Sequence, residues 1–542
     1  MQTSIASCDI DDAASRCTSM RPEKPAGWLA ALLGRFSLSR LLAVLAFVLV
    51  FCAPGFKDPD FYWHLKTGEL IARTGTVPTL DPYSSTFGGK PWVAHEWLSE
   101  LIFHWVDAAG GFQALRVVPA LAAAACFLLM FAIARRLVRH ETVASLVAAV
   151  FYLPLMPFFI LRPQIFTYVC FTACLLALVD LKYFRSKRLL WLIPVLTLGW
   201  VNLHGAYILA IGLLLAFIIT EWCNARLLPS SRCLPHKTLV LLGGVLALVT
   251  LATLVNPQGP RILAFPFQLV TMEASRSLLG EWQSPDFQEL LPRISLAGIF
   301  IYCSAAIYAK RKPDITEALL PAMAVIAGLT SWRHLPLMGI VLMTFTCVML
   351  REVSVADTIT SLLHRRQPPP SREKPQVSRA EAGAIHLMIL SFVMIAALIN
   401  LIPVERSATL NKRVPLGAIG YLLRNDVKGK MLNDYDLGGY LIYRLSPEYK
   451  VFIDGRADLY GDAFIRQYMQ SYYGEEGWDK LIEQHGIEFV ITSRDVPLRQ
   501  TLLADGRFAE TYLDKYHAVL LRRNIPRFHH LIGGSNENHN AR

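Results

Sequence analysis

Acidic and histidine side chains gather in one polar stretch, residues 57–100, between the first two apolar segments of the chain. Asp58 and Asp60 flank Pro59, and an acidic N-cap followed by proline in the first turn favours the start of a helix. His64 follows Asp60 at helical spacing and is therefore expected on the same face. A carboxylate in a partly dry site can act as a general base, so we predict catalytic roles for Asp60 and Asp58.

A second chemically active run follows a turn region rich in glycine and proline. This run is a predicted helical pattern that carries His95, Glu96 and Glu100. Histidines together with carboxylates can hold a divalent cation that neutralises a phosphate leaving group. We therefore predict that Glu96 is also catalytic, and that Mg²⁺ or Mn²⁺ is bound by His64, His95 and Glu96.

Further polar residues interrupt the apolar part of the chain at its predicted outward connections. Charged side chains at membrane depth cost roughly 2.5–3.5 kcal/mol each and are usually functional, although each could also pair structurally. Arginine suits a phosphate or pyrophosphate group, and tryptophan faces suit sugar rings or a prenyl chain. We predict a substrate-binding set made up of Arg162, Gln164, Asn202, His204, Glu281, Arg333, His334, Trp63 and Trp92.

Composition places the chain in a membrane. Of its 542 residues 54% are hydrophobic and 18% charged, with a mean hydropathy of +0.38, which is not the profile of a soluble protein. The net charge of +11 is spread over short loops. Such charges set the orientation of a membrane protein and contact anionic lipid head groups, so they do not indicate a nucleic-acid partner. The ten cysteines form no CxxC pair, so no cysteine-based metal site is expected.

Apolar runs predict about eleven transmembrane helices. Lys and Arg concentrate in alternate loops, so the positive-inside rule places the N-terminus in the cytoplasm and the large loop and the C-terminus outside. We expect a cytoplasmic segment 1–40 without a cleaved signal peptide, a transmembrane domain 41–402 with a large outer loop 57–112, and an outer domain 403–542. The spans are expected at 41–56, 113–134, 142–158, 165–181, 189–202, 205–223, 238–255, 293–309, 315–330, 335–350 and 384–402.

The C-terminal 140 residues have a different pattern. Strand-like runs at 428–434, 450–454, 487–492 and 517–523 enclose helical patterns at 462–473 and 477–485, which predicts a soluble α/β domain. The loop 454–461 (DGRADLYG) follows a strand-like run, where α/β folds often place ligand sites. Two interpretations stay open for it: a ligand-facing loop, or a turn in which Arg456 pairs with Asp454 or Asp458.

These motifs resemble the GT-C superfamily of integral-membrane glycosyltransferases, and in particular a bacterial group of GT-C-like membrane proteins. The resemblance covers residues 50–525 and rests on the runs 58–69 (DPDFYWHLKTGE), 91–97 (PWVAHEW), 162–164 (RPQ), 202–205 (NLHG) and 454–461. It implies a polyprenyl-phosphate-linked sugar donor, an outer active site, and an acid of the first outer loop as base or metal ligand. Asp58 and Asp60 match that acidic motif, although Pro59 splits the adjacent pair of the protein O-mannosyltransferases.

The expected protein is a multi-pass glycosyltransferase of the cytoplasmic (inner) membrane. It would transfer a sugar, with inversion, from a polyprenyl-phosphate donor to a glycan, lipid or protein acceptor at the outer face. Two alternatives stay open. A transporter or flippase for a lipid-linked precursor would need ionisable residues near the mid-membrane or on both faces. A non-catalytic assembly protein would keep the fold without the chemistry.

Overall fold

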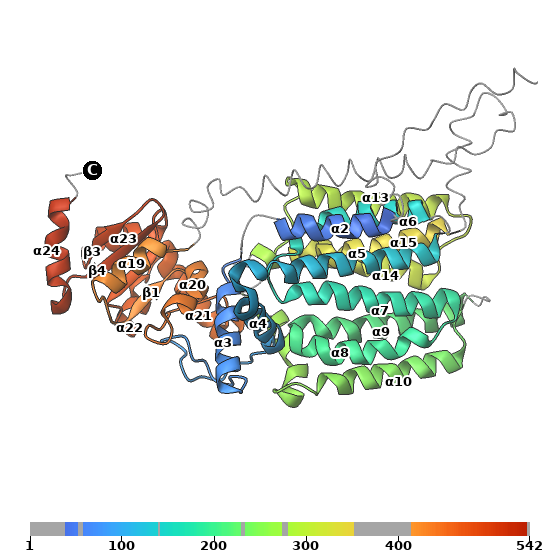
Figure 1. Ribbon diagram of the computed structural model, residues 1–542, viewed down its shortest axis with the longest axis horizontal. Coiled ribbons are helices and arrows are strands. Elements are labelled where there is room, and N and C mark those ends of the chain that lie inside the picture. Colours follow the sequence, from blue (N-terminus) through green and yellow to red (C-terminus); the bar gives the residue numbers. More distant parts are fainter. Residues whose placement is uncertain are drawn as a thin grey trace, which may run out of the picture.

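The computed structural model describes residues 38–52, 58–138, 141–228, 233–273, 280–351 and 414–538. Its long helices form a bundle with roughly parallel axes, and the chain ends in a separate domain at one end of that bundle (Figure 1). The predicted linker 351–382 and the last predicted span, 384–402, lie almost entirely outside the described residues.

Apolar helices account for the bundle. Six of them are long and apolar enough to cross a membrane: 117–137, 164–184, 205–227, 236–253, 290–308 and 332–350, with shorter apolar helices at 143–158, 188–203 and 315–330. They comprise α5 (Val117–Leu137), α6 (Glu141–Tyr152) with η2 (Leu153–Phe158), α7 (Gln164–Phe184), η3 (Arg188–Trp191) with α8 (Leu192–Leu203), η4 (Gly205–Tyr207) with α9 (Ile208–Leu227), α10 (His236–Thr253), α13 (Leu290–Tyr308), α14 (Ile315–Thr330), and η7 (Trp332–His334) with α15 (Leu335–Leu350).

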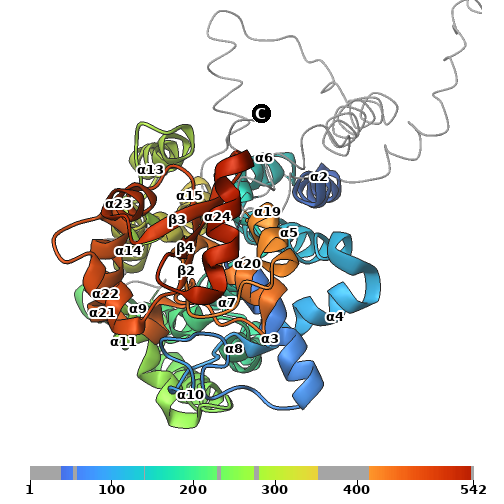
Figure 2. The same cartoon turned by 90° about the vertical axis from the view of Figure 1, so that its left-hand side faces the viewer.

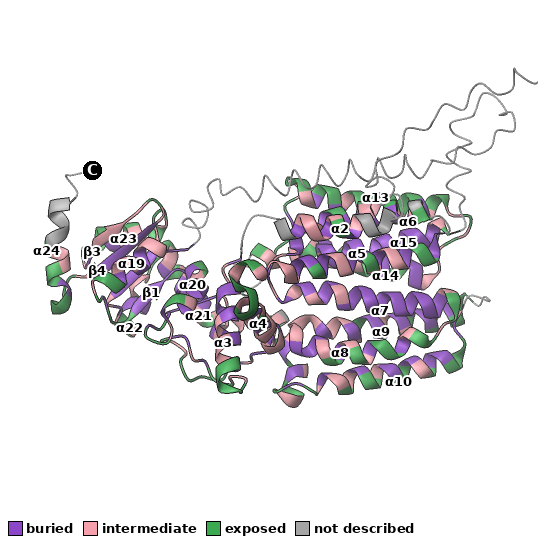
Figure 3. Ribbon diagram, in the orientation of Figure 1, coloured by how far each residue is buried: buried purple, intermediate pink, exposed green. Residues whose placement is uncertain are grey.

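The multi-pass architecture is thus confirmed, whereas the predicted count of eleven spans is not. Helix α2 (Leu38–Cys52) matches the first predicted span, but it has only 15 residues. Burial separates central from peripheral helices: α7 and α15 are buried along most of their length, while α13 exposes apolar side chains such as Phe300 and Ile307 (Figure 3). Exposed apolar side chains on a helix of this length are expected to face lipid.

Two helices of the large loop, α3 (Phe61–Thr74) and α4 (Trp97–Ala114), lie across the end of the bundle, with α3 between the bundle and the C-terminal domain (Figures 1 and 2). Both begin later than predicted. Asp60 occupies the N-cap position of α3 without a side-chain cap, and Asp58 Oδ1 instead accepts a hydrogen bond from the Asp60 N–H at 2.9 Å. His95 and Glu96 precede α4 rather than lying on it.

The C-terminal domain contains a four-stranded sheet of order β1-β2-β4-β3, in which β1 and β2 are parallel and the other pairs antiparallel. The predicted α/β class is therefore right, but β3 was not predicted, and the predicted strand 450–454 is not part of this sheet. The elements are α19 (Leu416–Arg424), β1 (Met431–Asn433), α20 (Tyr435–Leu445), α21 (Ala457–Tyr473), α22 (Asp479–His485), β2 (Phe489–Ser493), α23 (Pro497–Asp505), β3 (Phe508–Leu513), β4 (His517–Arg522), η8 (Pro526–Phe528) and α24 (His529–Asn538).

The segment 450–454 pairs with the large loop instead. Ser84 and Val451 form a parallel bridge, in which the Ser85 N–H donates to the Val451 carbonyl at 2.8 Å and the Val451 N–H donates to the Tyr83 carbonyl at 3.1 Å. Phe61 and Tyr62 of α3 share one hydrophobic core with side chains of α19 and α20. The large loop and the C-terminal domain therefore form one packed unit.

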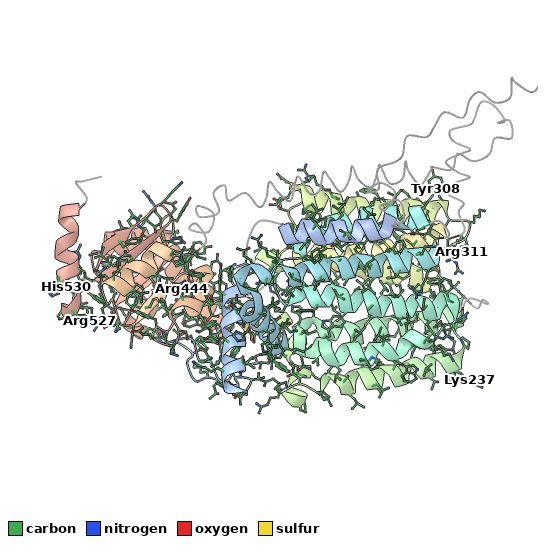
Figure 4. All side chains as sticks on the ribbon, in the orientation of Figure 1. Lys237, Tyr308, Arg311, Arg444, Arg527 and His530 are labelled. Atoms are coloured by element: carbon green, nitrogen blue, oxygen red, sulfur yellow. The ribbon has the colours of Figure 1, made fainter. Side chains whose placement is uncertain are left out.

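The two ends of the bundle differ in character. Lys237 and Arg311, both predicted on the cytoplasmic side, lie at the end far from the C-terminal domain, whereas Arg444 and His530 lie within that domain (Figure 4). The loop helices and the C-terminal domain thus cover the end of the bundle opposite to these basic residues.

Candidate active site

Arg162 brings together three carboxylates that are remote in sequence. It precedes α7, and its guanidinium directs a different nitrogen at each acid: Nε contacts Asp58 Oδ2, Nη2 contacts Asp60 Oδ2, and Nη1 donates to Glu281 Oε2 at 2.7 Å. Asp58 is 8% exposed and Arg162 is mostly buried. One cation facing three acids in a partly dry site leaves excess negative charge, which favours binding of a proton.

The C-terminal domain closes against this cluster through backbone atoms. A Cβ atom at Gly455 would lie 1.7 Å from Asp60 Oδ1, and one at Gly439 would lie 2.3 Å from the Pro59 carbonyl oxygen. Neither space could hold a side chain, so both glycines permit a close approach of the two parts. The DGRADLYG loop therefore forms a wall directly beside Asp60.

Asp60 has the electrostatics expected of a base. Burial raises its pKa, the neighbouring charges of Asp58 and Glu281 raise it further, and Arg162 offsets only part of this, so that the pKa of Asp60 is about 7. Burial also raises the pKa of Asp58. For Glu281 burial acts in the same direction, but the charges of Arg162 and Arg333 and the hydrogen bond from Arg162 together outweigh it and lower the pKa to about 2. The cluster thus contains one firmly ionised acid and two that bind protons more readily.

Beside this cluster, Glu96 faces three imidazoles. Its carboxylate lies 3.5 Å from His64 Nε2, 3.6 Å from His95 Nε2 and 3.4 Å from His204 Nε2. The other nitrogen of each ring is also engaged: His64 Nδ1 lies 3.1 Å from Glu100 Oε1, His95 Nδ1 lies 3.1 Å from the Val93 carbonyl, and His204 Nδ1 accepts from the Ala206 N–H at 3.2 Å. These second contacts orient the rings.

The three rings differ in protonation. Burial lowers the pKa of His64 to about 3 and that of His204 to about 4, so both are neutral at pH 7. Burial also lowers the pKa of His95, but the charges of Glu96 and Asp458 and the hydrogen bonds of the ring together outweigh burial, so the pKa lies above its usual value. For Glu96, burial raises the pKa and His95 lowers it by more, to well below its usual value. Glu96 is therefore a weaker base than Asp60.

The predicted metal site does not fit this arrangement. Among the described residues, no group of three or more His, Cys, Asp or Glu side chains is arranged to hold a metal ion. Arg162 lies between the three carboxylates, and the imidazoles of His64 and His95 each turn Nε2 toward Glu96. We therefore derive no step through a metal ion; dependence on Mg²⁺ or Mn²⁺ stays a prediction that activity in the presence of a chelator would test.

Three pockets meet at Arg162 and Glu281. The inter-domain pocket, about 540 Å³, lies between the cluster and the C-terminal domain and includes Asp58, Asp60, Tyr435, Asp436 and Tyr472. The histidine pocket, about 130 Å³, is lined by Asp60, Trp63, His64, His95, Glu96, Gln164, His204, Trp282, Arg333, Gly455, Arg456 and Asp458 among others. The bundle-edge pocket, about 160 Å³, is lined mainly by Pro157, Phe158, Ile160, Leu291, Trp332, Gln164 and Arg333.

Arg333 differs from Arg162 in being free to bind a ligand. It lines both the histidine pocket and the bundle-edge pocket, and its guanidinium lies 4.3 Å from the centre of the Trp282 ring. Within the described part of the chain its guanidinium has no hydrogen bond or ion pair. A half-buried arginine that makes no close ion pair can bind an anionic group of a ligand.

Most of the predicted site residues come together here, but three do not line the pockets. Asn202 is held by Trp97 Nε1 at 2.8 Å and by the Val255 carbonyl at 2.9 Å. Trp92 is buried beneath the Arg456 guanidinium, 4.6 Å from its ring centre. His334 precedes α15 outside the three pocket walls. These positions favour a structural role for Asn202 and Trp92, whereas a role of His334 in substrate binding stays a prediction.

Arg456, in the loop 454–461, links the C-terminal domain to the large loop. It is fully buried, donates through Nε and Nη2 to Asp454 at 2.8 and 2.7 Å, and through Nη1 to Asp81 of the large loop at 2.7 Å. Of the two interpretations of this loop, the pairing with Asp454 is thus present, and Asp81 was missed. Gly455 and Asp458 nevertheless line the histidine pocket, so the same loop is also a wall of the site.

No protein-family model matches the sequence, and no curated protein matches it. Solved structures do share its fold. The oligosaccharyltransferase AglB from Archaeoglobus fulgidus, in complex with an inhibitory peptide and a dolichol-phosphate, aligns with a TM-score of 0.53 and 12% identity over 84% of this chain and 69% of its own. ArnT from Cupriavidus metallidurans, bound to undecaprenyl phosphate, aligns with a TM-score of 0.51 and 12% identity over 89% of this chain and 97% of its own. The chain therefore has a GT-C-like membrane glycosyltransferase fold, as the sequence resemblance predicted.

Proposed function

We propose that the protein transfers a sugar from a polyprenyl-phosphate-linked donor to a hydroxyl acceptor at the outer face of the cytoplasmic membrane. The observation that carries this proposal is the position of Arg333 at the junction of an apolar pocket and a pocket that contains Asp60. That arrangement offers a place for a prenyl chain, an anion site for its phosphate and a base for the acceptor. The ligands of the two fold neighbours, dolichol-phosphate and undecaprenyl phosphate, support the donor class.

The donor would enter from the bundle. Phe158, Leu291 and Trp332 give the bundle-edge pocket an apolar wall that suits the first isoprene units. Arg333 would bind the phosphate, and the sugar would lie in the histidine pocket beside Trp63 and Trp282, whose rings offer stacking faces. Arg162 is occupied by carboxylates, so its role is to hold Asp60 rather than to bind the phosphate as the sequence suggested.

Asp60 would act as the general base. It removes the proton of the acceptor hydroxyl, the hydroxyl oxygen bonds to the anomeric carbon, and the bond from that carbon to the phosphate oxygen breaks. The products are the glycosylated acceptor with inverted configuration, free polyprenyl phosphate and a protonated Asp60. Arg333 stabilises the charge on the leaving phosphate, where electrostatic stabilisation counts most.

Changing Arg333 to glutamine is expected to weaken binding of polyprenyl phosphate by about 10- to 100-fold, because a charge-assisted hydrogen bond contributes roughly 1.5–3 kcal/mol. Binding to purified protein in nanodiscs, measured by native mass spectrometry or by competition, checks this. The exposed Arg261, changed to glutamine, is the matched control and should bind normally. If Arg333→Gln binds polyprenyl phosphate with unchanged affinity, the phosphate does not bind at Arg333.

The rate of transfer is expected to rise with pH through about 7 and to level off above it. Only the Asp60 carboxylate can accept the proton, and its folded-state pKa is about 7, so the active form is lost as the pH falls below that value. The rate of single-turnover transfer, measured as a function of pH, tests this rise. Asp60→Glu should keep a rise of the rate with pH, whereas the residual rate of Asp60→Asn should not depend on pH in this way. A wild-type rate that rises near pH 4 instead would contradict the assignment.

A further inference from the structure

The walls of the histidine pocket and the inter-domain pocket differ in the number of arginines that they carry. The wall of the histidine pocket has three guanidinium groups, Arg162, Arg333 and Arg456, beside four carboxylates, Asp60, Glu96, Glu281 and Asp458. The inter-domain pocket is more acidic, because five carboxylates line it and among the described residues of its wall Arg162 is the one cation. Asp60 lines both pockets. A ligand that approaches Asp60 through the inter-domain pocket would therefore meet a field that disfavours anions.

The inter-domain pocket also carries aromatic side chains from one helix. Tyr468 and Tyr472 of α21 stack with ring centres 5.9 Å apart, and Tyr473, 53% exposed, adjoins them. The Tyr468 hydroxyl accepts the Tyr435 N–H at 2.9 Å, whereas the Tyr472 hydroxyl has no hydrogen-bond partner within the described residues. Aromatic faces beside free polar groups bind ligands that are apolar on one face and hydroxylated at the edge, as sugar rings are.

One carboxylate of this wall is available to a ligand. Asp434 is occupied, because it accepts from the Thr492 hydroxyl and the Ser493 N–H, each at 2.6 Å. Asp436, at the start of α20, is exposed and has no hydrogen bond or ion pair among the described residues. Such a carboxylate accepts hydrogen bonds from hydroxyl or ammonium groups and repels phosphate.

We propose that the inter-domain pocket binds a saccharide acceptor that is uncharged or amino-bearing, and that its acidic wall excludes phosphorylated acceptors. That this saccharide is an acceptor rests on the proposed function, whereas its predicted binding preference does not depend on that function. In the 540 Å³ pocket, the saccharide directs one hydroxyl group toward Asp60. One of its rings stacks on Tyr472, and the saccharide donates a hydrogen bond to Asp436.

A matched set of ligands tests this preference: a short oligo-N-acetylglucosamine, its de-N-acetylated amino form, and the same oligosaccharide carrying a 6-phosphate. Binding of each to the full-length protein in nanodiscs is measured at low salt without donor. The amino form should bind about fivefold more tightly than the neutral form, a value typical of one partly exposed ion pair, and the phosphorylated form should bind most weakly.

Variants connect the preference to the pocket. Asp436→Asn should remove the advantage of the amino form, Asp436→Lys should reverse the order of amino and phosphorylated forms, and Tyr472→Ala should weaken all three. Glu448→Gln, at an exposed acid of the same domain, should change none. Equal or tighter binding of the phosphorylated form, an order unchanged in Asp436→Lys, or no binding of any form would overturn the inference. Donor binding that depends on Arg333 is measured separately, so either proposal can fail alone.

Discussion

Changing Asp60 to asparagine is expected to slow sugar transfer by about 10²–10⁴-fold, the usual contribution of a general base. The amide keeps the size of the side chain and can still contact Gly455 and Arg162, but it cannot take a proton. Donor binding should therefore stay within a few-fold of wild type, because the phosphate is expected to bind to Arg333 and not to Asp60. Single-turnover transfer and donor affinity, measured on the same preparation, separate the two effects.

The control for Asp60 is another acid on α3. Glu69 pairs with Lys66 at 3.0 Å, is 43% exposed and lies outside the pocket walls, so Glu69→Gln should transfer at the wild-type rate. Near-full transfer by Asp60→Asn would mean that Asp60 is a structural acid at a helix start, and that Asp58 or Glu96 would have to be reconsidered as the base.

Changing Arg456 to methionine is expected to destabilise the unit formed by the large loop and the C-terminal domain by about 3–5 kcal/mol, because it leaves Asp81 and Asp454 buried without their cation. The guanidinium also packs against the Tyr83 and Trp92 rings, and methionine replaces only part of that contact. Hydrogen exchange at residues 80–87 and 451–452 measures the free energy of opening of this interface.

The matched control is Arg466→Met. Arg466 pairs with Glu273 at 2.7 Å, but its side chain is 50% exposed and that of Glu273 is 72% exposed, so the loss should stay below about 1 kcal/mol. Exchange at 80–87 that is equally fast in Arg456→Met and wild type would show that the strand-like pairing of Ser84 with Val451 holds the parts together without the arginine.

Local patterns predicted the bundle well because a membrane helix needs only a long apolar run. Local patterns failed where a segment pairs with residues that are far away in the sequence. Val451 pairs with Ser84 of the large loop, more than 360 residues away, so its β-type sequence suggested a strand of the wrong sheet. The strand 508–513 (FAETYL) does not alternate apolar and polar residues, has only six positions and follows no strong turn pattern beyond Gly506.

The sequence predicted most of the residues that form the site, but not which of them contact one another. The outward position of Arg162 suggested a phosphate ligand, but the fold surrounds its guanidinium with Asp58, Asp60 and Glu281. His204 joins His64 and His95 only because the break between α8 and η4 turns its ring toward Glu96. The tyrosine-rich run 468–473 could have indicated a ligand wall, since its aromatic density exceeds what a helix packed on one face needs.

Release of free polyprenyl phosphate tests the central claim most directly. Wild-type protein, Asp60→Asn and Glu69→Gln are incubated in native lipids with a panel of polyprenyl-phosphate sugars and the neutral and amino oligosaccharides, and mass spectrometry follows the lipid product and the glycosylated acceptor. The proposal predicts both products with wild type and Glu69→Gln, and almost none with Asp60→Asn. Equal release by Asp60→Asn, or movement of the intact donor across proteoliposome membranes without any covalent change, would contradict it.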